Sequence, residues 1–157
     1  MEKNQVHLVE EKSQKIVDDL NVLLADVQVF YMNVKGYHWN IKGHQFFKLH
    51  EKFEELYDGL AEKGDEIAER ILTLEGRPVH SYSEFLNVAD IKEHTDASTA
   101  DDTVKGVVKG LQTLVERQRS LIEIASENGD ETTADMLTGF MSEQEKMIWM
   151  YNAFLKQ

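Results

Sequence analysis

Apolar residues recur every three or four positions along four long stretches of the chain, the spacing that one face of an α-helix produces. The stretches run from about 9 to 37, 45 to 74, 100 to 126 and 131 to 155. We therefore expect four long helices whose apolar faces pack into one core. The methionine and aromatic residues of the fourth stretch follow the same spacing, and we assign them to that core.

The breaks between these stretches carry residues that end helices. Gly36 and Gly43 bracket the first break, Gly76 and Pro78 follow the second stretch, and Gly129 separates the third from the fourth. A single proline in 157 residues leaves the long stretches uninterrupted. Each break therefore predicts a turn between two helices.

The second and third stretches are joined by a longer connection, residues 76–98. A short apolar piece at 85–88 predicts one or two helical turns within it. The fold class we expect is therefore all-α: a four-helix bundle with one long crossover and a short extra helix in that crossover. The length predicts one domain, residues 1–157.

The charge of the chain restricts its partners. Twenty-nine Asp and Glu against 17 Lys and Arg give a formal net charge of -12. Such a surface repels nucleic acid and concentrates cations. The absence of cysteine excludes disulfides, thiolate metal sites and cysteine nucleophiles. No signal peptide or membrane span is visible in the sequence, so we expect a cytoplasmic protein with no membrane partner.

Four metal-ligand side chains share one stripe of the second helix. His50, Glu54, Asp65 and Glu69 fall within about 100° of one another on a helical wheel. The midpoints of the two pairs are about 15 residues apart, roughly 22 Å along the axis, so one copy cannot bring all four to one small ion. The stripe also lies away from the apolar face, so it points outward from the bundle.

The same four positions are mirror-symmetric about the middle of the helix, just past Gly59. A second copy laid antiparallel across that point brings His50 and Glu54 of one chain against Glu69 and Asp65 of the other, twice, as a two-fold dimer requires. Small residues on or beside the stripe permit close approach, and apolar residues flank it: Ala61, Gly64 and Ala68, then Phe47 and Leu72. This pattern predicts an interface.

His38 adds a second imidazole. It lies at the end of the first helix, and the short turn through Gly43 allows it to converge with His50. Two imidazoles with three carboxylates suit Fe(II), Mn(II) or Zn(II). None of the six histidines has a glutamate three residues earlier, so the usual di-iron motif within one bundle is absent. The alternative is a solvated acidic helix with a chance histidine and no metal.

Two segments carry a family resemblance: HWNIKGHQFFKLH at 38–50 and DEIAER at 65–70. With their spacing and the four-helix layout, they resemble the Dps family of mini-ferritins. The resemblance implies a ferritin-like subunit, a hollow dodecamer, and ferroxidase centres at two-fold interfaces. His38 and His50 would come from one subunit, and Asp65 and Glu69 from its partner. Glu54 stands where the family often has aspartate.

The same resemblance implies an activity. Fe(II) would be oxidised, preferably by hydrogen peroxide, at centres holding up to two irons, and the ferric product would mineralise inside the shell. This protects against oxidative damage. Trp39 would lie beside the centre and intercept one-electron oxidants. Glu127, Glu131 and Asp135 match positions that line a three-fold pore in the family, although acidic residues at a helix start also favour its dipole.

The chain departs from the Dps pattern at two places, and alternative functions stay open. Residues 1–15 balance three lysines with three glutamates, and no basic extension follows Lys156. The Lys-rich tail that binds DNA in many Dps proteins is therefore not matched, and DNA binding is not expected. Gly64 stands at a position where related chains of that family tend to carry a larger residue. The rivals are a shell that sequesters zinc or other divalent ions without turnover, a DNA-compacting protein, and a scaffold without metal.

Overall fold

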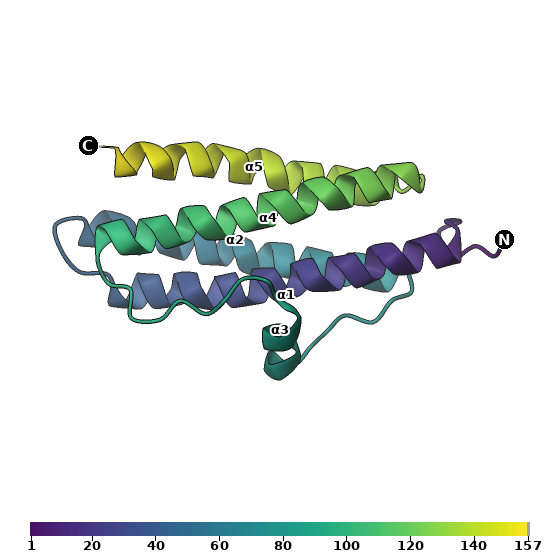
Figure 1. Ribbon diagram of the computed structural model, residues 1–157, viewed down its shortest axis with the longest axis horizontal. Helices are drawn as coiled ribbons and strands as arrows, with labels where there is room; N and C mark the ends of the chain where they lie inside the picture. Colours follow the sequence, from purple (N-terminus) through teal and green to yellow (C-terminus); the bar gives the residue numbers. More distant parts are fainter. Residues whose placement is uncertain (157) are drawn as a thin grey trace.

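The computed structural model describes residues 1–156, which form five helices (Figure 1). Four long helices and one short one follow in chain order: α1 (Glu10–Asn40), α2 (Phe46–Thr73), α3 (Tyr82–Val88), α4 (Ala100–Glu127) and α5 (Glu131–Leu155). The expected all-α bundle with a short helix in the crossover is confirmed. No helix in this part of the chain is long and apolar enough to cross a membrane.

The bundle consists of two helical hairpins. α1 packs most extensively against α2, and α4 against α5, while the crossover runs along α1 and carries α3 on the outside (Figure 1). Gly43 and Gly129 adopt φ values of 112° and 76° in the two tight turns, a conformation that glycine reaches without steric cost. The expectation that Gly36 begins the first turn was wrong, because α1 continues to Asn40.

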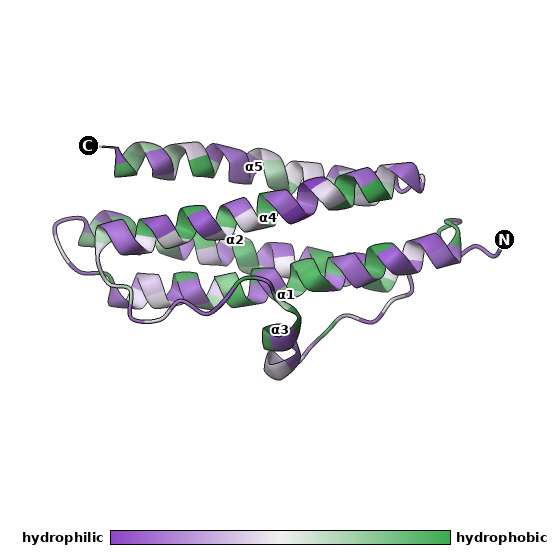
Figure 2. Ribbon diagram, viewed as in Figure 1, coloured by the Kyte–Doolittle hydropathy of each residue, from purple (hydrophilic) through white to green (hydrophobic). Residues whose placement is uncertain are grey.

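The apolar stripes meet in the core, as the spacing predicts. Figure 2 shows apolar (green) and polar (purple) positions alternating along each long helix, as expected for helices with one apolar face. The C-terminal half of α5 is the exception. Trp149 and Met150 are 66% and 45% exposed, and Met147, Tyr151 and Phe154 are half-buried. Met147, Tyr151 and Phe154 still pack against the core, as expected, but the assignment was wrong for Trp149 and Met150.

Polar side chains of α1 fasten the crossover. The Asp26 carboxylate is fully buried and accepts the backbone N–H groups of Asp90 and Ile91 at 2.7 and 2.9 Å. Seven residues further along α1, Asn33 donates to the carbonyl oxygen of Lys92 and accepts the N–H of His94, both at 2.9 Å. These contacts satisfy backbone groups that a strand-less segment would otherwise leave unpaired.

Candidate metal centre

His38 and His50 lie face to face across the α1–α2 turn. Their ring centroids are 3.7 Å apart and the ring planes differ by 13°. The His38 side chain is buried on the last turn of α1, and the His50 side chain is half-buried near the start of α2. The turn therefore brings the two imidazoles together, as the sequence predicts.

The two histidines hold each other through reciprocal hydrogen bonds. His38 Nδ1 donates to the carbonyl oxygen of His50 at 2.6 Å, and His50 Nδ1 donates to the carbonyl oxygen of His38 at 2.7 Å. A carbonyl oxygen only accepts, so each Nδ1 must carry the proton. In the neutral rings both Nε2 lone pairs are consequently free. Histidines that bind a metal through one ring nitrogen commonly donate a hydrogen bond from the other nitrogen to a backbone carbonyl.

Two aromatic rings fix the pair in place. Phe46 stacks on His50, with centroids 5.0 Å apart, and Tyr57 presents an edge to His38 at 5.3 Å. His38 Nε2 lies 3.6 Å from Glu54 Oε1, so the expected carboxylate stands beside the imidazoles. Sequence reasoning missed Phe46 and Tyr57. Their spacings of four and seven residues from His50 place them on its face of α2 and could have indicated them.

A lysine lies among aromatic rings next to the pair. Lys35 Nζ lies 4.9 Å from the centroid of Tyr31, 5.3 Å from that of Tyr57 and 5.6 Å from that of Trp39. Such contacts stabilise an ammonium group through the negative face of each ring. Loss of solvent contact raises the pKa of Tyr57, and the Glu54 carboxylate adds to the rise. Trp39 itself is 61% exposed.

Asp65 and Glu69 are not part of this cluster. Both are exposed on the unbroken helix α2, far from the histidines along its axis. Among residues 1–156, no group of three or more His, Asp or Glu side chains is close enough to hold a metal ion. One copy of the chain therefore places Glu54 near the histidine pair without forming a metal site, and it keeps Asp65 and Glu69 away from them.

An open hollow of about 690 Å³ surrounds Asp65. Ala61, Gly64 and Ala68 of α2 line it, with the segment that leads into α3 opposite. A Cβ on Gly64 would meet Gln28 of α1 at 3.1 Å. The lack of a side chain at Gly64 therefore allows α1 to pack closely against α2 within one subunit. This is separate from any contact between α2 and a second copy.

Large apolar side chains of α2 and of the start of α3 are exposed. Phe47 and Leu72, at the two ends of the α2 stripe, are 85% and 55% exposed, and Tyr82 at the start of α3 is 83% exposed. The sequence predicts that Phe47 and Leu72 point away from the core, and their exposure confirms this. Apolar side chains left in solvent in this way are available to contact a second chain.

The α4–α5 turn carries the acidic residues singled out from the sequence. Glu127, Glu131 and Asp135 are exposed, and the last two line a shallow hollow with Ser126 and Thr132. Asp130 differs from its neighbours, because it is buried, caps α5 and pairs with Arg70 at 2.8 Å.

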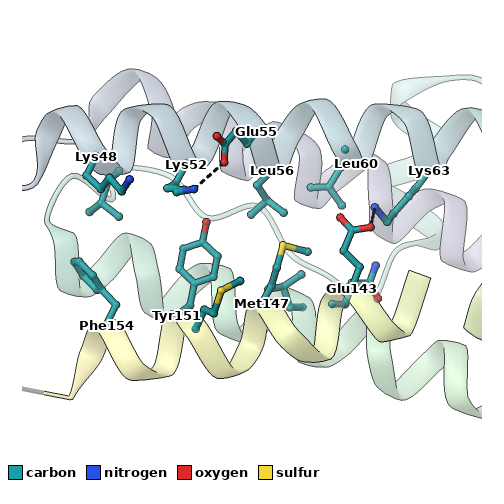
Figure 3. A pocket seen from close by; sticks show the side chains of 15 residues that line it. Lys48, Lys52, Glu55, Leu56, Leu60, Lys63, Glu143, Met147, Tyr151 and Phe154 are labelled. Carbon is teal, nitrogen blue, oxygen red and sulfur yellow. Dashed lines mark hydrogen bonds and ion pairs between the residues drawn. The ribbon is translucent and has the colours of Figure 1, made fainter. Parts of the chain in front are cut away.

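A second groove lies on the other side of α2, against α5 (Figure 3). It encloses about 360 Å³. Its two ion pairs join Lys63 to Glu143 and Lys52 to Glu55, both at 3.1 Å, and the hydroxyl of Tyr151 points toward the Lys52–Glu55 pair (Figure 3). The sequence did not predict this groove, since it arises from incomplete packing of α5. It contains none of the candidate ligands.

The sequence matches a known family over most of its length. The family model of the ferritin-like domain matches residues 17–157. The chain is similar over 99% of its length to the crystal structure of a Dps protein from Vibrio cholerae O1, with 51% identity, 98% of that chain covered and a TM-score of 0.98. The chain belongs to the Dps family of ferritin-like proteins. The Vibrio cholerae Dps is a member of a broad superfamily of ferritin-like diiron-carboxylate proteins.

Other Dps proteins are similar at lower identity. The Dps structure from Listeria innocua, soaked with zinc, has 37% identity and a TM-score of 0.87, with 90% of this chain and 97% of that chain covered. A DNA protection during starvation protein from Porphyromonas gingivalis is 48% identical over 86 residues, 55% of this chain and 54% of that protein. The chain spans about half the length of the curated relatives it matches.

Proposed function

We propose that the protein is a ferroxidase and iron store that uses hydrogen peroxide in preference to oxygen. Its centres form between two copies: His38, His50 and Glu54 come from one chain, and Asp65 and Glu69 from the other. The ferric product is held in a hollow shell of twelve copies, the number known for the family. Two Fe(II) ions supply two electrons to one hydrogen peroxide, which takes two protons and leaves as two water molecules.

The observation that carries the proposal is the reciprocal bonding of the histidines. It leaves two Nε2 lone pairs free, beside the Glu54 carboxylate. Imidazole nitrogen and carboxylate oxygen suit ferrous iron, and carboxylates stabilise the ferric product. The residues present therefore fit an iron site that lacks its remaining oxygen ligands.

The second copy supplies those ligands in this account. The continuous helix α2 spans both pairs, so antiparallel apposition aligns His50 with Glu69 at each end. The exposed apolar residues Phe47, Leu72 and Tyr82 and the hollow around Asp65 are available for that contact. Water exclusion by these side chains would strengthen the electrostatic attraction between the iron and the carboxylates.

Stopped-flow absorbance after mixing Fe(II) with peroxide tests the proposal. We expect ferric formation to slow by roughly 100-fold or more in His38→Ala and in Asp65→Ala, the scale of lost metal-site contacts. His44→Ala and Glu66→Ala are matched controls, since both side chains are exposed and lie outside the proposed site. Unchanged rates in His38→Ala and Asp65→Ala would contradict it.

Sequestration of zinc without turnover is a second candidate, favoured by the ligand types and by the zinc-soaked Listeria innocua relative. A sequestering shell would bind Zn(II) but would not accelerate ferric formation in the same stopped-flow assay. DNA compaction is disfavoured by the net charge of -12. We expect no gel shift of duplex DNA at physiological salt.

A further inference from the structure

A buried tyrosine, a histidine and an aspartate form a chain of contacts next to the candidate centre. Tyr37 immediately precedes His38, is 1% exposed, and shares a 2.5 Å hydrogen bond between its hydroxyl and His94 Nδ1. His94 Nε2 lies 3.7 Å from an Asp102 carboxylate oxygen. The three residues come from α1, the crossover and α4.

The positions of the charges assign the proton. The Asp102 carboxylate favours a proton on His94 Nε2, so Nδ1 accepts from the Tyr37 hydroxyl. The buried phenol donates its only proton to His94 Nδ1, so that proton stays on the oxygen at rest. Any electron that leaves this ring must therefore be accompanied by its proton, and His94 Nδ1 is the acceptor in reach.

The fold makes room for this contact at a specific position. A Cβ on Gly106 of α4 would collide with the Tyr37 hydroxyl and lie 2.9 Å from His94 Nδ1. The hydroxyl of Tyr37 is not needed to hold the crossover against α1, because Asp26 and Asn33 already bind the backbone of the crossover. The contact therefore calls for an explanation other than fastening the crossover.

We propose that Tyr37 is a redox-active residue that quenches one-electron oxidants, with His94 as its proton acceptor and Asp102 as the group that stabilises the charged imidazole. The inference rests on the proposed function for its oxidant: a single Fe(II) that meets peroxide yields Fe(III), hydroxide and hydroxyl radical. The hydroxyl radical takes one electron from Tyr37, directly or through an aromatic ring beside the centre, and becomes hydroxide. The phenolic proton moves to His94 Nδ1, leaving a neutral tyrosyl radical.

Fe(II), the proposed substrate, reduces the tyrosyl radical and so restores this relay of Tyr37, His94 and Asp102. A further Fe(II) gives one electron to the tyrosyl radical and becomes Fe(III), while the proton returns from His94 Nδ1 to the phenolic oxygen. The net result is that a second ferrous ion is oxidised and no free radical leaves the shell. Tyr37 differs in this from Trp39, which is exposed and whose ring faces the Lys35 ammonium group.

Freeze-quench electron paramagnetic resonance tests the relay on assembled shells given one Fe(II) per histidine pair and then peroxide. We expect a tyrosyl signal with an exchangeable proton coupling, lost in Tyr37→Phe and kept in Tyr151→Phe. Tyr151 is a matched control, since it is half-buried in the α2–α5 groove (Figure 3). In His94→Gln, which accepts a hydrogen bond but cannot hold a proton, the radical should form roughly 100-fold more slowly.

An iron-free arm separates this inference from the proposed function. Azide radicals made by pulse radiolysis oxidise the metal-free protein, and the same dependence on Tyr37 and His94 is expected there. Failure of ferrous oxidation with a normal radiolysis result would reject the ferroxidase but not the relay. The relay is overturned when the signal is absent from wild type, or survives Tyr37→Phe, or forms at wild-type rate in His94→Gln. Gly106→Ala, which pushes Tyr37 and His94 apart, provides a second route to the same loss.

Discussion

His38 and His50 each donate a hydrogen bond from Nδ1 to the main-chain carbonyl oxygen of the other, at 2.6 and 2.7 Å. The acceptors belong to the helix backbones, so packing of α1 against α2 sets the orientation of both rings. Neither bond depends on the identity of the partner's side chain. The fold itself therefore holds the two imidazoles in one arrangement, as a preorganised ligand pair would require.

This independence gives the first prediction. His50→Ala removes one ring but leaves the carbonyl that His38 donates to, so His38 keeps its orientation. We expect ferric formation to fall by roughly 100-fold, while the free energy of unfolding changes by about 1–2 kcal/mol. Urea denaturation alongside stopped-flow kinetics checks both. A variant that loses activity only because it unfolds would contradict the expectation.

The buried ion pair between Arg70 and Asp130 should matter more for stability than any exposed acid nearby. Asp130 also accepts the N–H of Thr133 at 3.0 Å, so its removal leaves the half-buried Arg70 guanidinium without its carboxylate and α5 without its cap. We expect Asp130→Ala to lower the free energy of unfolding by about 3–5 kcal/mol. Asp135→Ala, an exposed acid on the same helix, is the control and should change it by less than about 0.5 kcal/mol. Equal effects would be inconsistent with this assignment.

Asp26 should make stability depend on pH. Burial raises its pKa above the ordinary 3.8, against the opposing backbone N–H groups of Ile91 and Asp90 and the charge of Arg117. Between the ordinary and raised pKa values the folded state binds more protons than the unfolded state, so stability falls as pH rises through that window. Asp26→Asn keeps an oxygen for both N–H groups and removes the titration.

The test of Asp26 is the difference in unfolding free energy between wild type and Asp26→Asn, measured from about pH 3 to 7. We expect the wild type to lose stability relative to the variant as pH increases. A difference that is constant, or that grows in favour of the wild type, would show that the N–H groups and Arg117 outweigh burial.

The acids at the α4–α5 turn are proposed to admit Fe(II). A ring of carboxylates concentrates and passes cations. Glu131→Ala with Asp135→Ala should therefore slow ferric formation at low Fe(II) by roughly tenfold, and the deficit should shrink at saturating Fe(II). The control is Glu123→Ala, an exposed acid further back on α4. An equal deficit at every iron concentration would indicate damage to the centre instead.

The fold was accessible from sequence because its determinants are local. The three-and-four spacing of residues such as Leu20, Leu24 and Val27 fixes the core face of α1, and all three are buried. The convergence of His38 and His50 followed from the short turn between them. Gly36 misled the prediction of where α1 ends, because a glycine only weakens a helix that tertiary packing supports.

The rest of the site depends on contacts between distant segments. The pairing of Tyr37 with His94 joins positions 57 residues apart, and no local pattern reports it. The exposure of Trp149 was unpredictable for a similar reason, since the periodicity of an apolar face does not say whether the same chain or another copy covers it. Both features required the packed bundle.

The central claim is that two chains share each centre, and subunit mixing tests it most directly. Differently tagged His50→Ala and Asp65→Ala chains are co-expressed, and shells containing both are purified. In a mixed two-fold pair, one centre carries both substitutions and the other carries neither. Random pairing should restore ferric formation to about one quarter of the wild-type rate, although each variant alone is inactive. Mixed shells that stay as inactive as their parents would contradict a centre built between chains.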